Sequence, residues 1–285
     1  MPRVVWSIYF GYCGFRMLFV YSSEDAVSIG AADELKSMLN MEHDMEIDGN
    51  MHFRQGDGLE MLGVGTRLVD ADYVERLVKT DFIVFLSKHS SAAGVPAFTV
   101  HSEGNWSDAA ALGGAAKELS VAAPVQMKGF LAALHAAASE AKVDVQVVYE
   151  ATHHGPLLKT PSFFAELGGN VETTQDTRLI GVLAEAAERF THPEGDTMDY
   201  DKIAVYIGGM HYARRATELA LNKDYASAHI MPKHYVDNVE LLEQAFSRSS
   251  VKPEIALIEW KSINADKRNK VLRKLEDMGL DHERV

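Results

Sequence analysis

The sequence contains one cysteine, Cys13, among 285 residues. A single cysteine excludes an internal disulfide and a structural metal cluster built from several thiolates. Any metal site must therefore take its ligands from His, Asp or Glu, a ligand set that suits zinc in an open catalytic site. We expect the protein to work in a reducing cytoplasm.

Long apolar runs are also missing, because no run approaches the roughly 18 residues needed to cross a bilayer. Positive charge is scarce: 28 Lys and Arg stand against 41 Asp and Glu, so the formal net charge is −13. An acidic chain is poorly suited to binding nucleic acid through a broad charged face, so any RNA contact must be local. We expect no membrane partner, no DNA partner and a monomer.

Three common motifs are absent as well. The chain has no GxGxxG, no GxxxxGK[ST] and no GxSxG, which argues against a dinucleotide fold, a phosphate-binding loop and a serine nucleophile elbow. Serines do occur at Ser87, Ser90 and Ser91. Their spacing singles out none of them, so a serine mechanism is disfavoured.

Short apolar segments alternate with helical ones, a pattern typical of a layered α/β domain. Most of the strands are too continuously apolar for a sheet with one solvated face, which favours helices on both faces. The sequence thus predicts a three-layer α/β/α fold with a mixed, mostly parallel sheet. Strands are predicted at 17–21, 82–86, 97–100, 143–149, 203–207, 228–231 and 254–258, and helices at 25–39, 124–141, 176–190, 211–222, 236–247 and 263–278.

We expect one α/β domain over residues 17–285, with a small excursion near 42–68, where Gly, Met and His occur without a clear period. The first predicted strand starts cleanly at Met17. Residues 1–16 are therefore predicted to be an upstream extension, and the alternative is an extra strand packed on the domain.

Histidines gather at the ends of the predicted strands, and α/β folds bind ligands at the carboxyl ends of parallel strands. If these strands are neighbours, His101, His153, His154 and His211 should share one pocket. The histidines that follow or lie in a predicted strand are His89, His101, His153, His154, His211 and His229.

The densest motif is the run from Glu150 to Pro156, EATHHGP. It combines the carboxylate of Glu150, the hydroxyl of Thr152 and the imidazoles of His153 and His154 in one turn after a strand. One histidine could bind a metal while the other acts as acid, base or supporting group. The alternative is a solvated loop with two incidental histidines.

Two further segments carry candidate residues. Gly208 and Gly209 follow a strand, where free backbone amides could hold an anion or a developing oxyanion, although a tight turn explains a glycine pair equally well. Thr160 to Ser162 is predicted to open a short helix in which Ser162 caps the first turn. Glu166 has the stronger functional claim because it follows the histidine pair closely in sequence.

At these residues the sequence resembles the archaeal and plant type of D-aminoacyl-tRNA deacylase, from Met17 onward. EATHHGP is long and specific, whereas the other matches are short but correctly ordered. Two departures are Gly169, where the family often has serine, and Arg214, where it often has proline. The matching segments are Ser23-Glu24-Asp25, Ser87-Lys88-His89-Ser90, Thr99-Val100-His101 with Gly104-Asn105, Glu150 to Pro156, Pro161-Ser162-Phe163 with Glu166 and Gly168, Gly208-Gly209 with His211-Tyr212-Ala213, and His229-Ile230 with Pro232-Lys233.

The resemblance implies a phosphorylase/peptidyl-tRNA-hydrolase-like fold, a zinc cofactor and hydrolysis of the ester bond of D-aminoacyl-tRNA. Another zinc-dependent peptidase or amidase, or a non-catalytic tRNA-binding protein, remains the alternative. We assign catalytic roles to Glu150, Thr152, His153, His154 and Glu166, and metal ligation to His101, His153, His154 and His211. Substrate contacts are expected from Lys88, His89, Asn105, Ser162, Gly208, Gly209, His229 and Lys233.

The last predicted helix offers a local basic surface for tRNA. Lys267, Lys270 and Lys274 are spaced by three and four residues and so share one face. With Arg214 and Arg215 they would form a platform for the acceptor arm. The alternative is a solvated helix face with no partner.

Overall fold

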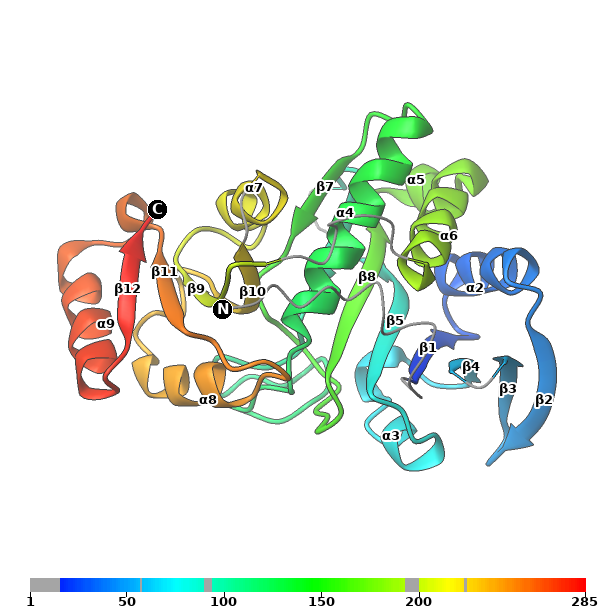
Figure 1. Ribbon diagram of the computed structural model, residues 1–285, viewed down its shortest axis with the longest axis horizontal. Coiled ribbons are helices and arrows are strands. Elements are labelled where there is room, and N and C mark those ends of the chain that lie inside the picture. Colours follow the sequence, from blue (N-terminus) through cyan, green and yellow to red (C-terminus); the bar gives the residue numbers. More distant parts are fainter. Residues whose placement is uncertain (1–15, 57, 90–93, 193–199, 223–224) are drawn as a thin grey trace.

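The computed structural model describes residues 16–56, 58–89, 94–192, 200–222 and 225–285. The expected extension at residues 1–16 therefore lies, apart from Arg16, outside the described residues. In the described residues the strands form two sheets, one of eight strands and one of four, which lie at opposite ends of an elongated molecule (Figure 1). No helix in this part of the chain is long and apolar enough to cross a membrane.

The large sheet has the strand order β2-β3-β4-β1-β5-β8-β6-β7. Strands β4, β1, β5 and β8 run parallel to one another, β6 is antiparallel to β8, and β7 is parallel to β6. The predicted mixed, mostly parallel sheet is thus confirmed. Its strands are β1 (Met17–Ser22), β2 (Glu42–Ile47), β3 (Asn50–Gln55), β4 (Leu59–Val64), β5 (Phe82–His89), β6 (Ala97–His101), β7 (Gln146–Tyr149) and β8 (Ser162–Gly168).

The small sheet has the order β10-β9-β11-β12, and all of its pairs are parallel. Its strands are β9 (Lys202–Ile207), β10 (Tyr225–Met231), β11 (Ile255–Ile258) and β12 (Asp281–Arg284). The buried residues of β9 belong to two cores: Ile203, Ala204 and Tyr206 join one, and Val205 and Ile207 join the other. A sheet buried on both faces explains why β9 and β11 are apolar without alternation, whereas the edge strand β12 is polar and largely exposed.

Helices cover both faces of the two sheets, as the three-layer prediction requires. Helices α2 (Ala26–Met38), α4 (Pro124–Glu140) and α6 (Thr177–Thr191) share one core with the large sheet. The same core extends over α4 to α7 (Arg214–Asn222) and one face of the small sheet. The opposite faces are covered by η2 (Leu68–Asp70) and α3 (Val74–Leu77) on the large sheet, and by η3 (Val239–Leu241), α8 (Leu242–Ser247) and α9 (Ala265–Asp277) on the small sheet. The remaining short helices are α5 (Val171–Gln175) and η4 (Trp260–Ser262).

Local signals account for the helix ends. The Asp25 carboxylate accepts hydrogen bonds from the amides of Val27 and Ser28 at the start of α2, and Pro124 occupies the first turn of α4. The cap of α9 is Asn264, which accepts from the Lys267 amide. Each cap satisfies amides that have no partner within the helix.

Two segments differ in kind from the sequence prediction, and β12, α3 and α5 were not predicted. The stretch set apart as an excursion near 42–68 supplies β2, β3 and β4 to the large sheet, and β4 pairs directly with β1. Ser162 does not open a helix, because it begins β8, a strand buried along its whole length. A strand that is buried on both faces shows no alternation of apolar and polar residues and is recognised by a continuous apolar run. In β8, Ser162 and Glu166 interrupt that run.

Candidate active site

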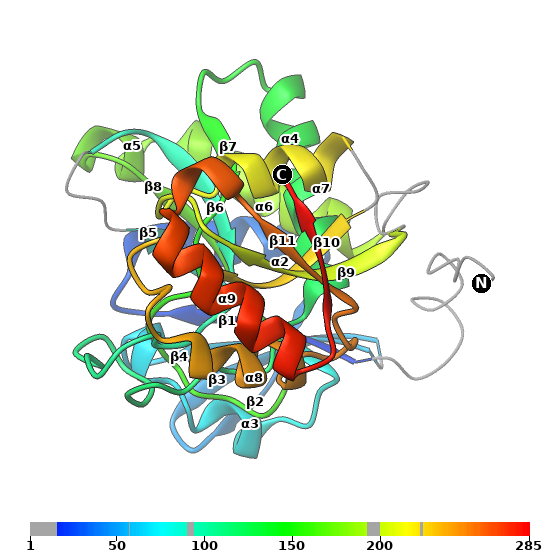
Figure 2. The same ribbon diagram turned by 90° about the vertical axis from the view of Figure 1, so that its left-hand side faces the viewer.

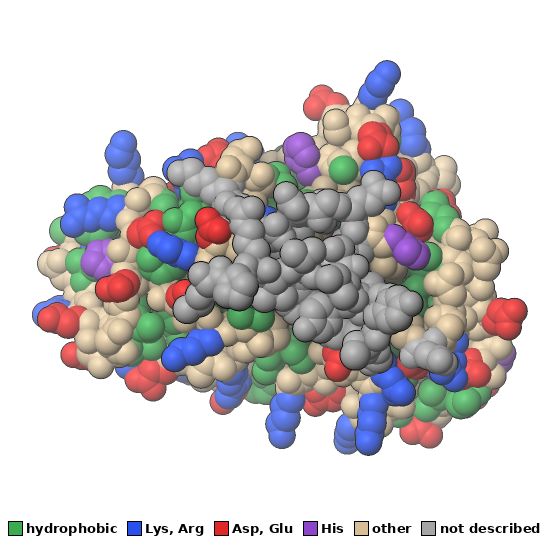
Figure 3. Space-filling view, viewed as in Figure 1, with side chains coloured by type: hydrophobic (Ala, Val, Ile, Leu, Met, Phe, Trp, Pro, Cys, Tyr) green, Lys and Arg blue, Asp and Glu red, His purple; other side chains and the backbone are tan. Residues whose placement is uncertain are grey.

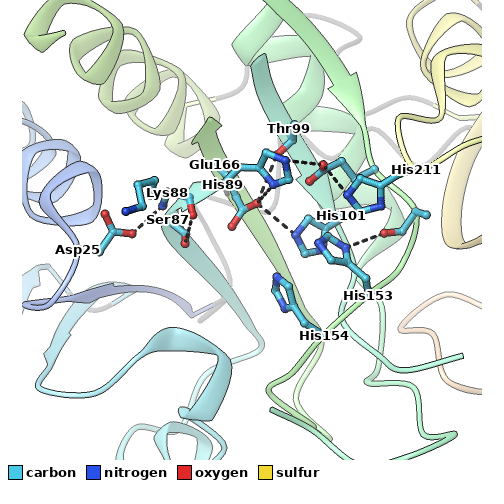
Figure 4. Close-up of polar contacts among 12 residues, drawn as sticks. Asp25, Ser87, Lys88, His89, Thr99, His101, His153, His154, Glu166 and His211 are labelled. Carbon is cyan, nitrogen blue, oxygen red and sulfur yellow. Dashed lines mark hydrogen bonds and ion pairs between the residues drawn. The ribbon is translucent and has the colours of Figure 1, made fainter. Parts of the chain in front are cut away.

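The ends of the two sheets meet at a cluster of histidines (Figure 4). Ring centroids of His101 and His153 are 4.1 Å apart, those of His101 and His154 are 4.9 Å apart, and those of His153 and His211 are 4.6 Å apart. The structure therefore brings together the four histidines that the sequence assigned to one pocket. His101 ends β6 of the large sheet, and His211 follows β9 of the small sheet.

Backbone hydrogen bonds tie these two sheet ends together. The amide of Ala151 donates to the carbonyl of His211 at 2.8 Å, and the amide of Thr152 donates to the carbonyl of Ile230 at 3.0 Å. The chain that leaves β7 thus crosses to the small sheet and carries Glu150, His153 and His154 with it. This crossing places the motif at the junction of the two sheets.

Two buried carboxylates, Glu150 and Glu166, contact the histidines of the cluster. Glu166 of β8 lies 3.3 Å from Nδ1 of His89 and 3.5 Å from Nε2 of His101. Glu150 lies 3.3 Å from Nε2 of His89 and 3.0 Å from Nε2 of His211. His89 therefore bridges the two carboxylates, a central position for a residue expected only to contact substrate.

The carboxylates divide the histidines by charge. Burial of His101 disfavours its protonated form, but the close contact and negative charge of Glu166 outweigh this effect and raise the pKa of His101 to about 9. Burial raises the pKa of Glu166, but the close contacts with His101 and His89 outweigh this effect and hold that pKa well below its usual range. His101 is therefore protonated and Glu166 ionised at neutral pH. The two side chains form a buried ion pair in which each charge is balanced by the other.

His153 and His154 have the opposite character. Burial and the neighbouring His101 charge lower the pKa of His153 well below 6.5 and that of His154 to about 4. Nδ1 of His153 donates to the carbonyl of Ala151 at 2.9 Å, and Nδ1 of His154 donates to that of Gly155 at 2.6 Å. Because a carbonyl can only accept, both rings keep the Nε2 lone pair, which is the tautomer a metal ligand needs.

The residues of the cluster fit a metal ion. Ligand atoms of three sets lie within 4.8 Å of one another: His101 with His153 and His154, His89 with Glu150 and His211, and His101 with Glu150 and Glu166. Three buried atoms of the cluster have no hydrogen-bond partner within the described residues. They are both carboxylate oxygens of Glu150 and Nε2 of His101. Three histidines, or two histidines and a glutamate, are the ligand sets of catalytic zinc sites.

Backbone geometry sets the direction of His154. Its φ is 44°, in the left-handed region that a side chain with a Cβ rarely occupies. Gly155 follows it, and a Cβ at this glycine would lie 2.2 Å from the amide nitrogen of Gly114. The close approach of the 113–114 loop therefore requires glycine here and supports the turn that presents His154.

Thr152 and His229 form a buried support beneath this turn. Nε2 of His229 donates to the carbonyl of Arg248 at 2.9 Å, so its Nδ1 is an acceptor facing Ser102 and Thr152 at 3.2 and 3.3 Å. Thr152 Oγ1 also accepts from the Ile230 amide. His229 was expected to contact substrate. It is instead fully buried, and its contacts position the backbone of the motif.

The glycine pair does not offer free amides. The amide of Gly208 donates to the Met231 carbonyl at 2.8 Å, and that of Gly209 donates to Ser262 Oγ at 2.8 Å. Both glycines have positive φ, and a Cβ on Gly208 would lie 2.6 Å from Ser262 Oγ. This geometry supports the tight-turn alternative and not the oxyanion role.

The other predicted substrate residues lie around the cluster. Lys88 is exposed at the end of β5, where its amide donates to Asp25 at 2.7 Å. Asn105 donates to the carbonyls of Gly113 and Ala115 and holds that loop. Lys233 is partly buried, with its amide bonded to the Gly209 carbonyl. Ser162 is buried and donates to Glu103 at 3.1 Å.

Glu103 was not among the residues predicted for the site. It is fully buried, pairs with the backbone beside His153, and burial raises its pKa to about 8. The only signal in the sequence is its place in the polar run after His101. Its partner Ser162 is distant in sequence, so the pair was not visible there.

The lysines of α9 and the arginine pair, which together were expected to form the tRNA platform, differ in their surroundings. On α9, Lys267 and Lys270 both pair with Asp237, at 2.8 and 2.9 Å, and Lys274 pairs with Glu243. These pairs favour the solvated-face alternative. The face in Figure 3 likewise shows Lys and Arg side chains interspersed with Asp and Glu. Arg214 and Arg215, by contrast, are exposed close to the cluster.

The sequence of this chain is similar to those of known proteins. A family model described as D-aminoacyl-tRNA deacylase matches residues 77–283. A D-aminoacyl-tRNA deacylase of Ignicoccus hospitalis is 40% identical over 203 residues, which is 70% of this chain and 80% of the relative. The one of Pyrococcus furiosus is 33% identical over 249 residues, which is 84% of this chain and 88% of the relative.

A solved structure agrees with the fold. A crystal structure described as a conserved protein of unknown function has a TM-score of 0.86, with 28% identity and 96% of each chain covered. The histidines and carboxylates of the cluster all fall within the residues that the family model matches. On the extent of these matches, the chain belongs to the D-aminoacyl-tRNA deacylase family.

Proposed function

We propose that the protein hydrolyses the ester bond between a D-amino acid and the terminal ribose of tRNA, releasing both. The observation that carries this proposal is the buried cluster of histidines and carboxylates within the part of the chain that matches the family. The proposed partner is tRNA carrying a D-amino acid, and the proposed place of action is the cytoplasm.

The proposed cofactor is zinc. His101, His153 and His154 would hold it, or His211 with Glu150 and His89. When bound there, zinc supplies a Lewis acid for the ester carbonyl and a hydroxide at neutral pH. His153 and His154 already have the neutral form that ligation needs, whereas His101 must give up the proton it shares with Glu166.

The remaining residues have distinct proposed tasks. His211 has a half-exposed side chain, and its Nε2 lies 3.0 Å from Oε1 of the fully buried Glu150. This pair can pass a proton to the ribose oxygen that leaves, because one member reaches solvent and the other stabilises the imidazolium. Glu166 orients His89 and His101, and Thr152 with His229 fixes the backbone of the motif.

The direct test is a deacylation assay on D-tyrosyl-tRNA and L-tyrosyl-tRNA with and without a chelator. We expect release of D-tyrosine, much slower release of L-tyrosine and loss of activity in chelator. Equal rates on both enantiomers would remove the chiral assignment. Cleavage of peptides with indifference to tRNA would support a peptidase or amidase, and binding of tRNA without turnover would support a non-catalytic protein.

A further inference from the structure

Two cavities form one groove beside the histidine cluster. A cavity of about 500 Å³ is lined by Tyr212, Arg214, Arg215 and Glu259, among others. A second cavity, of about 400 Å³, is lined by Arg215, Glu259, Trp260, Lys261 and Arg284. The cavities share Arg215 and Glu259 and therefore adjoin each other, and we call the two together the groove.

The inner end of this groove lies at the candidate active site. Tyr212 stacks on His211 with ring centroids 5.9 Å apart and an interplanar angle of 24°. The outer end is lined by Arg215 of α7, by Trp260 and Lys261, and by Arg284 of β12, and α7 and the end of β12 lie close together in the view of Figure 2. A polymer whose end enters the cluster at His211 can therefore leave along this groove.

The groove is lined by more cations than acids, with Arg214, Arg215, Lys261 and Arg284 against Glu218 and Glu259. Of its acids, Glu218 pairs with Arg215 at 2.9 Å, and Glu259 accepts from the Tyr206 hydroxyl at 2.5 Å. Arg214, Lys261 and Arg284 form no ion pair with a carboxylate in the described ranges. The lysines of α9 differ, since each of the three forms an ion pair, Lys267 and Lys270 with the shared Asp237 and Lys274 with Glu243.

Trp260 holds one of these cations in place. The Arg284 guanidinium carbon lies 3.8 Å from the centroid of the Trp260 ring, and that of Arg268 lies 4.8 Å from the same centroid. A guanidinium stacked on an aromatic ring loses little further entropy when it binds an anion, and its N–H fork matches a phosphate. Arg284 is thus preorganised in an exposed position.

We infer that this groove, lined by Arg214, Arg215, Trp260, Lys261 and Arg284, binds the phosphodiester backbone of the single-stranded 3′ end of tRNA. The inference rests on the proposed function, because the ester lies on the terminal ribose and the strand must continue from the cluster. A local groove of free cations also lets a protein of formal net charge −13 bind RNA without a broad basic face.

The test compares two double variants that each remove two positive charges. Lys261→Ala with Arg284→Ala removes free cations of the groove, and Lys267→Ala with Lys270→Ala removes the paired lysines of α9. For each, KM and kcat on D-tyrosyl-tRNA and the Kd of uncharged tRNA are measured from 50 to 300 mM salt. D-tyrosyl-adenosine, which has no phosphate, serves as the small substrate.

We expect the groove variant to raise KM and Kd roughly tenfold at low salt and to reduce the log–log salt slope by up to about 1.4, since each single-strand phosphate contact contributes about 0.7. Its kcat and its rate on D-tyrosyl-adenosine should match the wild type, and the α9 variant should change KM less than about twofold. Unchanged KM, Kd and slope in the groove variant, or equal effects of both variants, would overturn the inference. If the wild type failed to cleave D-tyrosyl-tRNA, the proposed function would fall, while the Kd of uncharged tRNA would still decide whether the groove binds RNA.

Discussion

Oε1 of Glu150 lies 3.0 Å from Nε2 of His211, and this contact joins two different sheets. Glu150 follows β7 of the large sheet, whereas His211 follows β9 of the small one. Glu150 is fully buried, while the His211 side chain is half exposed. The contact therefore links a carboxylate shielded from solvent to an imidazole that a substrate can reach.

The first prediction concerns metal removal. Dialysis against a chelator should abolish deacylation of D-tyrosyl-tRNA, and addition of zinc should restore it, because the His and Glu sets of the cluster fit a catalytic zinc ion. Elemental analysis before and after dialysis provides the matching metal content. Full activity in protein that contains no metal would refute the zinc proposal.

The second prediction concerns His154. His154→Asn should lower kcat by at least roughly 100-fold, as expected when a metal ligand or acid/base group is removed. Asparagine is the suitable replacement because it tolerates the left-handed backbone at φ 44°. His135, exposed on α4, provides the matched control, and His135→Asn should keep wild-type kcat. A His154→Asn enzyme of normal kcat would exclude both roles.

The third prediction concerns Glu166. Glu166→Gln should lower kcat by about 10- to 100-fold, because outer groups that orient metal-binding histidines have effects of this size. Loss of its charge should also lower the pKa of His101 from about 9, which histidine NMR of the metal-free protein can follow. Glu172→Gln, at an exposed position of α5, is the control. An unshifted His101 titration would show that Glu166 does not hold its proton.

The fourth prediction concerns stability at acid pH. Burial lowers the pKa of His229 to about 4, whereas an unfolded chain binds that proton near pH 6.5. Between these values only the unfolded state is protonated, so stability falls as the pH falls. From pH 7 to pH 5, His229 should account for a loss of about 2 kcal/mol in the free energy of unfolding.

His229→Gln removes this titration and keeps an N–H donor for the Arg248 carbonyl. Urea unfolding at pH 7 and pH 5 should therefore show a smaller pH-dependent loss in the variant, by about 2 kcal/mol. The other buried histidines contribute equally to both proteins and cancel. The same pH dependence in both proteins would mean that His229 is not held neutral in the folded state.

Much of the site was predictable because its residues are adjacent in sequence. Glu150, Thr152, His153 and His154 lie within five positions, and α/β folds deliver such motifs from strand ends. Helix boundaries followed from local chemistry as well, as Pro124 and Asp25 illustrate. These features depend on neighbours within a few residues, so the sequence alone determined them.

Long-range pairing decided the rest. The position of β8 between β5 and β6 brings Glu166 against His89 and His101, and the polar Ser162 and Glu166 interrupt the apolar run that would mark β8 as a buried strand. Likewise, the spacing of Lys267 and Lys270 predicts a shared face, but only the folded chain brings Asp237 against them. Charge and ligation depend on which side chains meet in space, and tertiary packing alone decides that.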